Sequence, residues 1–169
     1  MRKIQYILLL ALFPLLSSCG IYNFTGAGPI KAKSFQVSYF QNVSELIEPG
    51  IERDFTQRLQ NLIQNQTNLN LTNTNGDLLY EGEIVEYRIS PMTATANANL
   101  SAAQNRLTVT VNVRFSNKNE AEDHFEKRFS FFYDFPADQQ LTGSTRKAAF
   151  DEIFDRITQD IFTASLAKW

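Results

Sequence analysis

The chain has 169 residues, of which 43% are hydrophobic and 20% charged, with seven glycines, five prolines and one cysteine. This is the composition of an ordinary globular chain, and it excludes collagen-like, disordered and disulfide-stapled proteins. The net charge of −2 and the lack of a basic run exclude a general nucleic-acid-binding protein, because duplex affinity rests on many phosphate-neutralising Lys and Arg side chains.

Residues 1–18 have the layout of a secretory signal. Arg2 and Lys3 precede the apolar run Ile7–Leu16, as the charged and hydrophobic regions of a signal peptide do. The run is too short for a permanent transmembrane helix, which needs roughly 20 residues. We therefore expect residues 1–18 to be removed, which lowers the net charge to −4 because Arg2 and Lys3 leave with them.

The segment Leu16-Ser17-Ser18-Cys19 matches the bacterial lipobox, with an aliphatic residue three positions before the cysteine and small residues between. Small side chains leave room for the processing enzymes, and the thiolate accepts the lipid group. Cys19 is the only cysteine of the sequence, so it has no partner for an internal disulfide. We expect Cys19 to be the lipid attachment site, and an ordinary cleaved signal with an incidental cysteine is the alternative.

The residue after Cys19 is Gly20, and a non-acidic residue there favours export to the outer membrane in many Gram-negative bacteria. The sequence thus predicts a lipid-anchored outer-membrane protein that faces the periplasm. Residues 19–33 carry closely spaced glycines among few apolar residues, and we interpret them as the lipidated tether. Residues 34–169 contain no repeat or linker and are expected to form one domain.

The first elements of this domain are a strand, a helix and a short strand. Ser34–Phe40 alternates in polarity and predicts a strand, with Phe35, Val37 and Tyr39 expected on one face and Phe40 on the other. Ile51–Gln66 has apolar residues at helical spacing and predicts an amphipathic helix. Leu69–Thr72 is consistent with a short strand.

Three longer strands are predicted at Leu78–Ser90, Leu107–Ser116 and Phe125–Phe135, because their apolar residues alternate. The last two are expected to pair as a hairpin across Asn117–Asp123. Ser144–Lys168 repeats apolar residues at helical spacing and predicts the second helix.

Within Leu78–Ser90 the apolar residues change parity, which predicts a β-bulge near Ile84–Val85. Gly82 in the same run suggests the close approach of another backbone.

The order β-α-β-β-β-β-α predicts an α+β two-layer sandwich. We expect a mostly antiparallel sheet of four to five strands with both helices on one face.

The segment Pro91–Arg106 is long for a connection between strands and has a single charge. Loops longer than about 12–15 residues are usually functional or disordered. A charge-poor loop suits insertion into another protein, because neutral polar groups cost less to desolvate than charges. A floppy hairpin extension is an equally open interpretation.

Residues that carry catalytic chemistry are scarce. The single histidine, His124, is placed at a turn, which does not hold an imidazole rigidly against a nucleophile. The sequence lacks a His/Cys cluster for a transition metal, a phosphate-binding glycine loop and a nucleophile-elbow motif. We expect a non-enzyme without a metal or cofactor.

The chain resembles the lipopolysaccharide-assembly lipoprotein (LptE-like) family, and its sequence is closest to the version of the family found in Bacteroidota. The resemblance spans nearly the whole chain after the signal, and it lies in five stretches: Cys19–Gly26, Phe35–Phe40, Tyr80–Ile84, Asn105–Val113 and Asp160–Phe162. It implies a lipoprotein that plugs an LptD-like outer-membrane β-barrel, assists the assembly of that barrel and supports insertion of lipopolysaccharide (LPS) into the outer leaflet.

A protein with this function needs cationic side chains that bind the LPS phosphates and a surface that contacts the barrel. Arg88, Arg106 and Arg114 are the candidate phosphate contacts, since two of them lie on or beside the polar face of predicted strands and one flanks the long loop. The candidate barrel contacts are Asn97, Asn99 and Leu100 in the long loop and Phe132 on the polar face of its strand. Two alternatives stay open, namely a periplasmic lipid- or solute-binding lipoprotein and a scaffold lipoprotein of another envelope machine.

Overall fold

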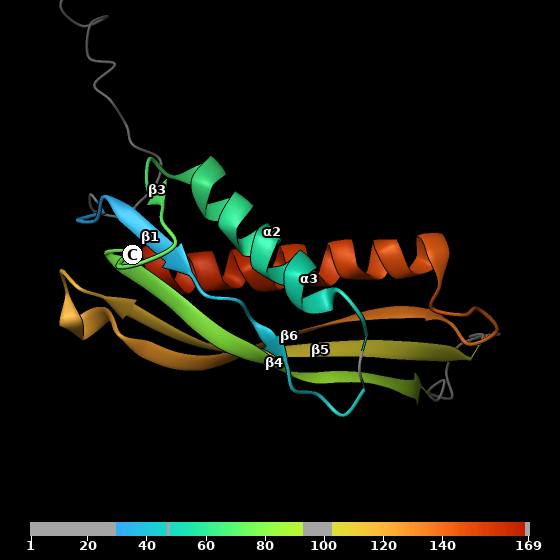
Figure 1. Ribbon diagram of the computed structural model, residues 1–169. Coiled ribbons are helices and arrows are strands. Elements are labelled where there is room, and N and C mark those ends of the chain that lie inside the picture. The colour runs from blue at the N-terminus through green and yellow to red at the C-terminus, as the bar shows by residue number, and fades with distance from the viewer. Residues whose placement is uncertain (1–29, 47, 93–102, 168–169) are drawn as a thin grey trace, which may run out of the picture.

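One mixed six-stranded sheet and two helices that cover one of its faces make up the fold of the computed structural model (Figure 1). The structure describes residues 30–46, 48–92 and 103–167. The predicted signal segment, Cys19 and the loop residues Asn97, Asn99 and Leu100 lie outside the described residues. The predicted two-layer α+β class, with both helices on one face, is confirmed.

The sheet order is β3-β1-β4-β5-β6, and β2 also pairs with β4. The strands are β1 (Ser34–Val37), β2 (Gln41–Asn42), β3 (Asn70–Leu71), β4 (Leu78–Met92), β5 (Gln104–Asn117) and β6 (Phe125–Pro136). The pairs β4–β5 and β5–β6 are antiparallel, whereas β1 and β2 run parallel to β4, and β3 runs parallel to β1. The two long ladders are antiparallel, as predicted, and the sheet is mixed rather than purely antiparallel. The short parallel pairs arise because a helical crossover between β2 and β3 returns the chain in the same direction.

The helices α2 (Ile51–Gln66) and α3 (Gly143–Leu166) lie where the sequence predicts them, and the β5–β6 turn holds the short 3₁₀ helix η2 (Ala121–Asp123). Helix α3 packs on β6 and β5, and α2 packs beside α3 and over β1 (Figure 1). The buried stripe of α2 consists of Ile51, Phe55, Thr56, Leu59 and Ile63. The stripe of α3 includes Phe150, Ile153, Phe154, Ile157 and Ile161.

The predicted face of Phe40 is wrong. Strand β1 ends at Val37, after which Phe40 is fully buried and Tyr39 is 55% exposed. The backbone N–H of Phe40 donates a hydrogen bond to Oγ1 of Thr56 on α2 at 3.1 Å. The regular alternation of a strand does not extend through this segment, because a helical side chain replaces the strand neighbour as the partner of the Phe40 amide.

The β-bulge and the close approach at Gly82 are both confirmed. The register of β4 against β5 shifts between Ile84 and Glu86, so apolar side chains on both sides of the shift face the helices. A Cβ at Gly82 would lie 2.0 Å from the carbonyl oxygen of Asn112 and 2.6 Å from Cε1 of Phe40. Residue 82 therefore has to lack a side chain for the Phe40 ring to reach the sheet.

Aromatic rings fill the space between the two layers. The ring centroids of Phe40 and Phe55 are 5.1 Å apart, those of Phe55 and Phe154 5.4 Å, and those of Phe154 and Phe150 5.4 Å. Buried Tyr80 shares a hydrogen bond of 2.9 Å with the hydroxyl of Ser165, and burial raises the pKa of the Tyr80 phenol. The interior is thus packed with side chains that join the sheet to both helices.

Substitution of Gly82 by alanine is expected to destabilise the domain by about 3 kcal/mol, because the new methyl group overlaps a backbone oxygen and a buried ring. Urea denaturation followed by circular dichroism measures this loss. Gly143→Ala is the matched control, since Gly143 has φ 53° but no atom within 4 Å of the added Cβ. Its cost is limited to about 1–2 kcal/mol of backbone strain, and equal losses in the two variants would contradict the packing role of Gly82.

Candidate functional site

The face of the sheet opposite the helices is polar and holds all three arginines that the sequence singled out. Arg88 on β4 lies opposite Thr108, Arg106 on β5 lies opposite Asp134, and Arg114 lies opposite Glu126. These side chains share one face because residues two apart along a strand point to the same side. We refer to the polar side chains of β4, β5 and β6 on this side as the open face.

Arg106 forms a bidentate ion pair on the open face. Its Nε and Nη2 donate hydrogen bonds to Oδ1 and Oδ2 of Asp134, both at 2.7 Å. The guanidinium carbon lies 3.6 Å from the centroid of the Phe132 ring, which is a favourable cation–π arrangement. These hydrogen bonds from Arg106 hold the pKa of Asp134 below its usual range.

Arg88 and Arg114 are also paired with carboxylates. Arg88 Nε donates to Glu86 at 2.8 Å, and the Thr110 hydroxyl donates to the other oxygen of Glu86 at 2.7 Å. The hydrogen bond from Thr110, and then that from Arg88, lower the pKa of Glu86. Arg114 donates to both oxygens of Glu83 at 3.2 and 3.1 Å. Each arginine predicted to meet phosphate is therefore neutralised by a carboxylate of its own face.

Arg128 is a residue of the open face that sequence reasoning missed. It lies opposite Asn112 on β5 and forms no salt bridge with any residue that the structure describes. Arg128 and Arg88 border a surface depression of about 410 Å³ at the β-bulge, together with Glu86 and Thr110. Arg128 could have been found from the sequence, because it lies an even number of residues from Phe132 on the same strand and therefore points to the same face.

The structure brings Arg88, Arg106 and Phe132 to one end of the sheet and leaves Arg114 at the other. Phe132, at 40% exposure, lies opposite Thr108, the residue that also faces Arg88. The long connection leaves the sheet at this end, since its flanking residues Met92 and Gln104 are paired.

The chain enters the domain at the opposite end of the sheet. The backbone N–H groups of Lys33 and Ser34 donate to Oδ2 of Asp77 at 2.8 and 3.1 Å, and Lys31 forms a salt bridge of 2.9 Å with Glu120. The hydrogen bond from the backbone of Lys33 is the main cause of the lowered pKa of Asp77. Since β4 begins beside Asp77 and has 15 residues, the entry point and the long connection are separated by about 45 Å.

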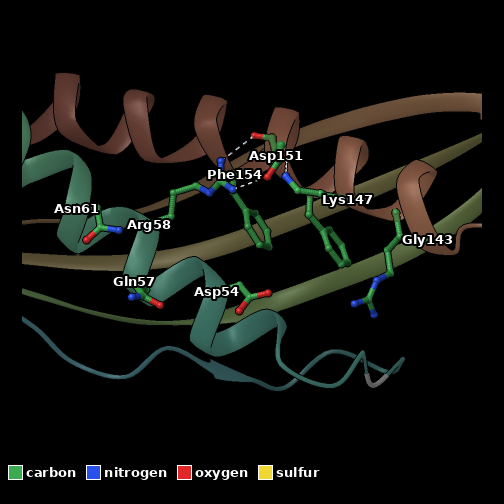
Figure 2. A pocket seen from close by; sticks show the side chains of 10 residues that line it. Asp54, Gln57, Arg58, Asn61, Gly143, Lys147, Asp151 and Phe154 are labelled. Atoms are coloured by element: carbon green, nitrogen blue, oxygen red, sulfur yellow. Dashed lines mark hydrogen bonds and ion pairs between the residues drawn. The ribbon is translucent and has the colours of Figure 1, made fainter.

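A second polar surface lies in the groove of about 550 Å³ between α2 and α3. Figure 2 shows Arg58 of α2 reaching across the groove to Asp151 of α3. Arg58 also pairs with Asp155, and both contacts are 2.6 Å long. Hydrogen bonds from Lys147, and then Arg58, lower the pKa of Asp151. Through Arg58 these two carboxylates join the two helices.

His124 closes the turn after η2. Its Nε2 lies 2.9 Å from the backbone oxygen of Asn117, and because a carbonyl only accepts, Nε2 carries the proton of this hydrogen bond. The residues that the structure describes contain no group of three or more His, Cys, Asp or Glu side chains able to hold a metal ion. Neither α2 nor α3, the two α-helices described, is both long and apolar enough to span a membrane.

These features define a class of protein, namely a two-layer α+β domain. One face of its sheet packs against the helices, and the other face is exposed and carries ion pairs. A family model described as lipopolysaccharide-assembly (LptE) matches residues 32–165, and the chain belongs to this family. The chain is accordingly a lipopolysaccharide-assembly lipoprotein of a family whose members lie at the outer membrane and face the periplasm. Membership implies association with an LptD-type barrel and with LPS in general.

Several solved structures are similar to this chain at low sequence identity. A hypothetical protein from Chlamydia trachomatis is 11% identical with a TM-score of 0.50, and the match covers 81% of this chain and 100% of that chain. The rare lipoprotein B from Shewanella oneidensis is 10% identical with a TM-score of 0.46, covering 76% and 89%. Uncharacterized lipoprotein B from Nitrosomonas europaea is 14% identical with a TM-score of 0.47, covering 84% and 86%. No curated protein matches the chain.

The Arg106–Asp134 pair is expected to make the stability of the domain depend on pH. The pKa of Asp134 is lowered in the folded chain, so the pair stabilises the fold above the unfolded-state pKa of about 3.9 and loses this contribution as the pH falls through the folded-state pKa. Asp134→Asn should therefore lower the urea midpoint at pH 7 and converge with the wild type in acid. Asp138→Asn, at an exposed position of the β6–α3 connection, is the control, and a constant offset of Asp134→Asn at every pH would contradict the assignment.

Proposed function

We propose that the protein plugs an LptD-like outer-membrane β-barrel from the periplasmic side, assists the assembly of that barrel and supports insertion of LPS into the outer leaflet. The observation that carries this proposal is the match of the lipopolysaccharide-assembly family model over residues 32–165. A barrel wide enough for a lipid-linked saccharide needs its lumen filled. We expect the protein to act without catalysis, metal or cofactor.

The packed interior favours a plug over a lipid carrier. A protein that carries lipid or solute between sheet and helices needs a hollow there, whereas here the rings of Phe40, Phe55 and Phe154 are in contact through that layer. A filled domain keeps its shape inside a barrel lumen, because close-packed interiors resist compression.

The two ends of the sheet suit a plug held by a lipid. Under this proposal residues 19–33 are the tether, and acyl chains on Cys19 hold the entry end, near Asp77, at the inner leaflet. Tethering also raises the effective concentration of the domain at the barrel. The end of the sheet with Phe132 then projects about 45 Å away. We propose Phe132, together with Asn97, Asn99 and Leu100 of the long connection, as the barrel contacts.

The three candidate arginines are already paired with carboxylates, so each has to leave its carboxylate before it can bind an LPS phosphate. In the proposed function Arg88, Arg106 and Arg114 meet LPS phosphates by exchanging one anionic partner for another. Charge-assisted hydrogen bonds to phosphate resemble those to a carboxylate in strength, so such an exchange is feasible. Arg128, which forms no salt bridge with a described residue, contributes a cation to the same face without an exchange.

Cys19→Ala is expected to release the protein from the outer membrane, because the thiol that accepts the lipid is gone. Fractionation of the envelope should find the variant in the soluble periplasmic fraction, and mass spectrometry of the wild type should find acyl chains on its first residue. The unchanged Cys19 chain is the control. Retention of the Cys19→Ala variant in the outer membrane would contradict the lipid anchor.

The barrel partner is tested by solubilising outer membranes, capturing a tagged wild-type chain and identifying what accompanies it. We expect an LptD-like barrel protein, and its absence would refute the plug. Deletion of residues 97–103 should reduce recovery of the barrel while the melting curve stays that of the wild type, because the deletion leaves the paired strands intact. Unchanged recovery would refute a role of this loop in the contact.

A further inference from the structure

Strand β6 is one edge of the sheet and leaves its outer side free. Among the described residues, β6 pairs with β5 on its inner side and with no strand on its outer side. All 12 residues of β6 pair with β5 in one register, without the bulge that interrupts β4. A long and regular edge presents unpaired backbone N–H and C=O groups, which are a template for pairing with another strand.

The register of the β5–β6 hairpin shows which backbone groups point outward. The N–H of Ala137 donates to the oxygen of Ala103 at 2.9 Å, and these two residues continue the pairing of β5 with β6 by one step. Hydrogen-bonded and non-hydrogen-bonded pairs alternate along an antiparallel ladder, so the odd-numbered residues of β6 bond to β5. The N–H and C=O groups that point away from the sheet belong to Glu126, Arg128, Ser130, Phe132 and Asp134.

The side chains of these outward residues lie on the open face and include one cation without an ion pair. Arg128 is exposed and forms no salt bridge with a described residue, and Asp134 lies six residues further along the strand. Each oxygen of Asp134 accepts one hydrogen bond from Arg106, and a carboxylate oxygen can accept a second one. The edge of β6 therefore carries a cation in need of a partner and a carboxylate with acceptor capacity left.

A second copy of the chain fits this edge in one antiparallel register. With a two-fold axis beside Phe131, Arg128 lies opposite Asp134 of the second copy, and the symmetry forms this ion pair twice. Opposite charges on directly opposed residues stabilise paired strands. Ser130 and Phe132 lie opposite each other between the two ion pairs, so all the outward backbone groups from Arg128 to Asp134 have partners.

The other registers are less favourable. Because the outward groups of the two copies have to face each other, the axis passes beside a residue of β6 in every register. An axis at Ser130 sets Glu126 opposite Asp134, and an axis at Lys127 or Arg128 sets that cation opposite itself. Like charges directly opposite each other are destabilising, and the remaining axes within β6 pair no opposite charges. Charge complementarity therefore selects the first register.

The helix side of the edge is compatible with this register. Phe131 meets its own copy at the axis, and aromatic pairs across strands are favourable. Arg156 of α3 lies 5.7 Å from the centroid of the Phe131 ring, but its charge is balanced by Asp160 at 3.6 Å. Lys127 is the one charged residue of β6 on the helix side, and in this register it lies near the end of the overlap, opposite Phe135.

We propose that the outer edge of β6 binds a second copy of this chain, so that two sheets join into one across a two-fold axis beside Phe131. About eight backbone hydrogen bonds form between the two strands, and each Arg128 gains a carboxylate. The pairing is isologous and closes with two copies. The other end of the sheet order is the two-residue strand β3, which is too short to continue the sheet into a fibre. The proposal concerns the chain by itself and does not depend on the barrel.

The dimer itself is tested by sedimentation equilibrium of the unanchored Cys19→Ala chain. We expect a dimer, and we expect Arg128→Glu to weaken its association about tenfold, because a glutamate then lies opposite Asp134. Lys127→Glu is the matched control, since this neighbouring exposed residue of β6 makes the same change in charge but faces no acid in the proposed register. Circular dichroism shows that both variants fold. A monomer at every concentration, or equal weakening by the two variants, would overturn the inference.

The register is tested by disulfide formation. Cys19 is the only cysteine of the sequence, so Cys19→Ala with Phe131→Cys leaves a single thiol, at the proposed axis. The two copies of residue 131 would have Cα atoms about 4.5 Å apart, within the range of a disulfide, whereas those of residue 130 would be about 7–8 Å apart. We expect oxidation to link the Phe131→Cys chain about tenfold more than Ser130→Cys. The reverse ratio would overturn the proposed register.

The barrel is the other occupant that these variants can detect. If the Cys19→Ala chain is a monomer and Arg128→Glu in the anchored chain lowers the recovery of barrel protein from solubilised outer membranes, the edge of β6 belongs to the barrel and the inference is overturned. If the dimer forms and is weakened by Arg128→Glu while the wild-type chain recovers no barrel, the plug fails and the dimer stands.

Discussion

The contact of the Phe40 ring with Gly82 is the constraint on which the packing of this domain depends. Because residue 82 has no side chain, the ring lies directly against the β4 backbone, within reach of Phe55 on α2. Phe55 in turn meets Phe154 on α3. A methyl group at position 82 would separate the layers at the centre of the core, where close packing leaves little room for adjustment.

Because the two helices cover one face of the sheet, the charged side chains of the strands lie on the other face. Both helices lie on the same side (Figure 1), so the open face keeps its charged residues in contact with water. Bidentate pairs such as Arg106 with Asp134 leave these charges largely balanced. An anionic ligand on this face therefore has to compete with carboxylates.

The elements themselves could be predicted from the sequence because their signals are local. Ile51–Gln66 is an amphipathic repeat that needs no knowledge of its neighbours, and the change of parity near Ile84 is visible within one run of residues. Phe40 was placed on the wrong face because the reason for its burial, Gly82 and Thr56, lies 16 or more residues away along the chain. The parallel pairing of β1 with β4 likewise depends on the path of the crossover and not on either strand alone.

For the candidate site, the sequence by itself determined which residues are polar, which strand face Arg106 and Phe132 share, and the lipobox around Cys19. Only the tertiary structure decided that each predicted arginine has a carboxylate partner and that Arg128 forms no salt bridge with a described residue. The physical reason is how far apart along the chain the residues that determine each feature lie. Parity and composition are properties of a few neighbouring residues, whereas ion pairs and surface patches form between segments that only the packed sheet brings together.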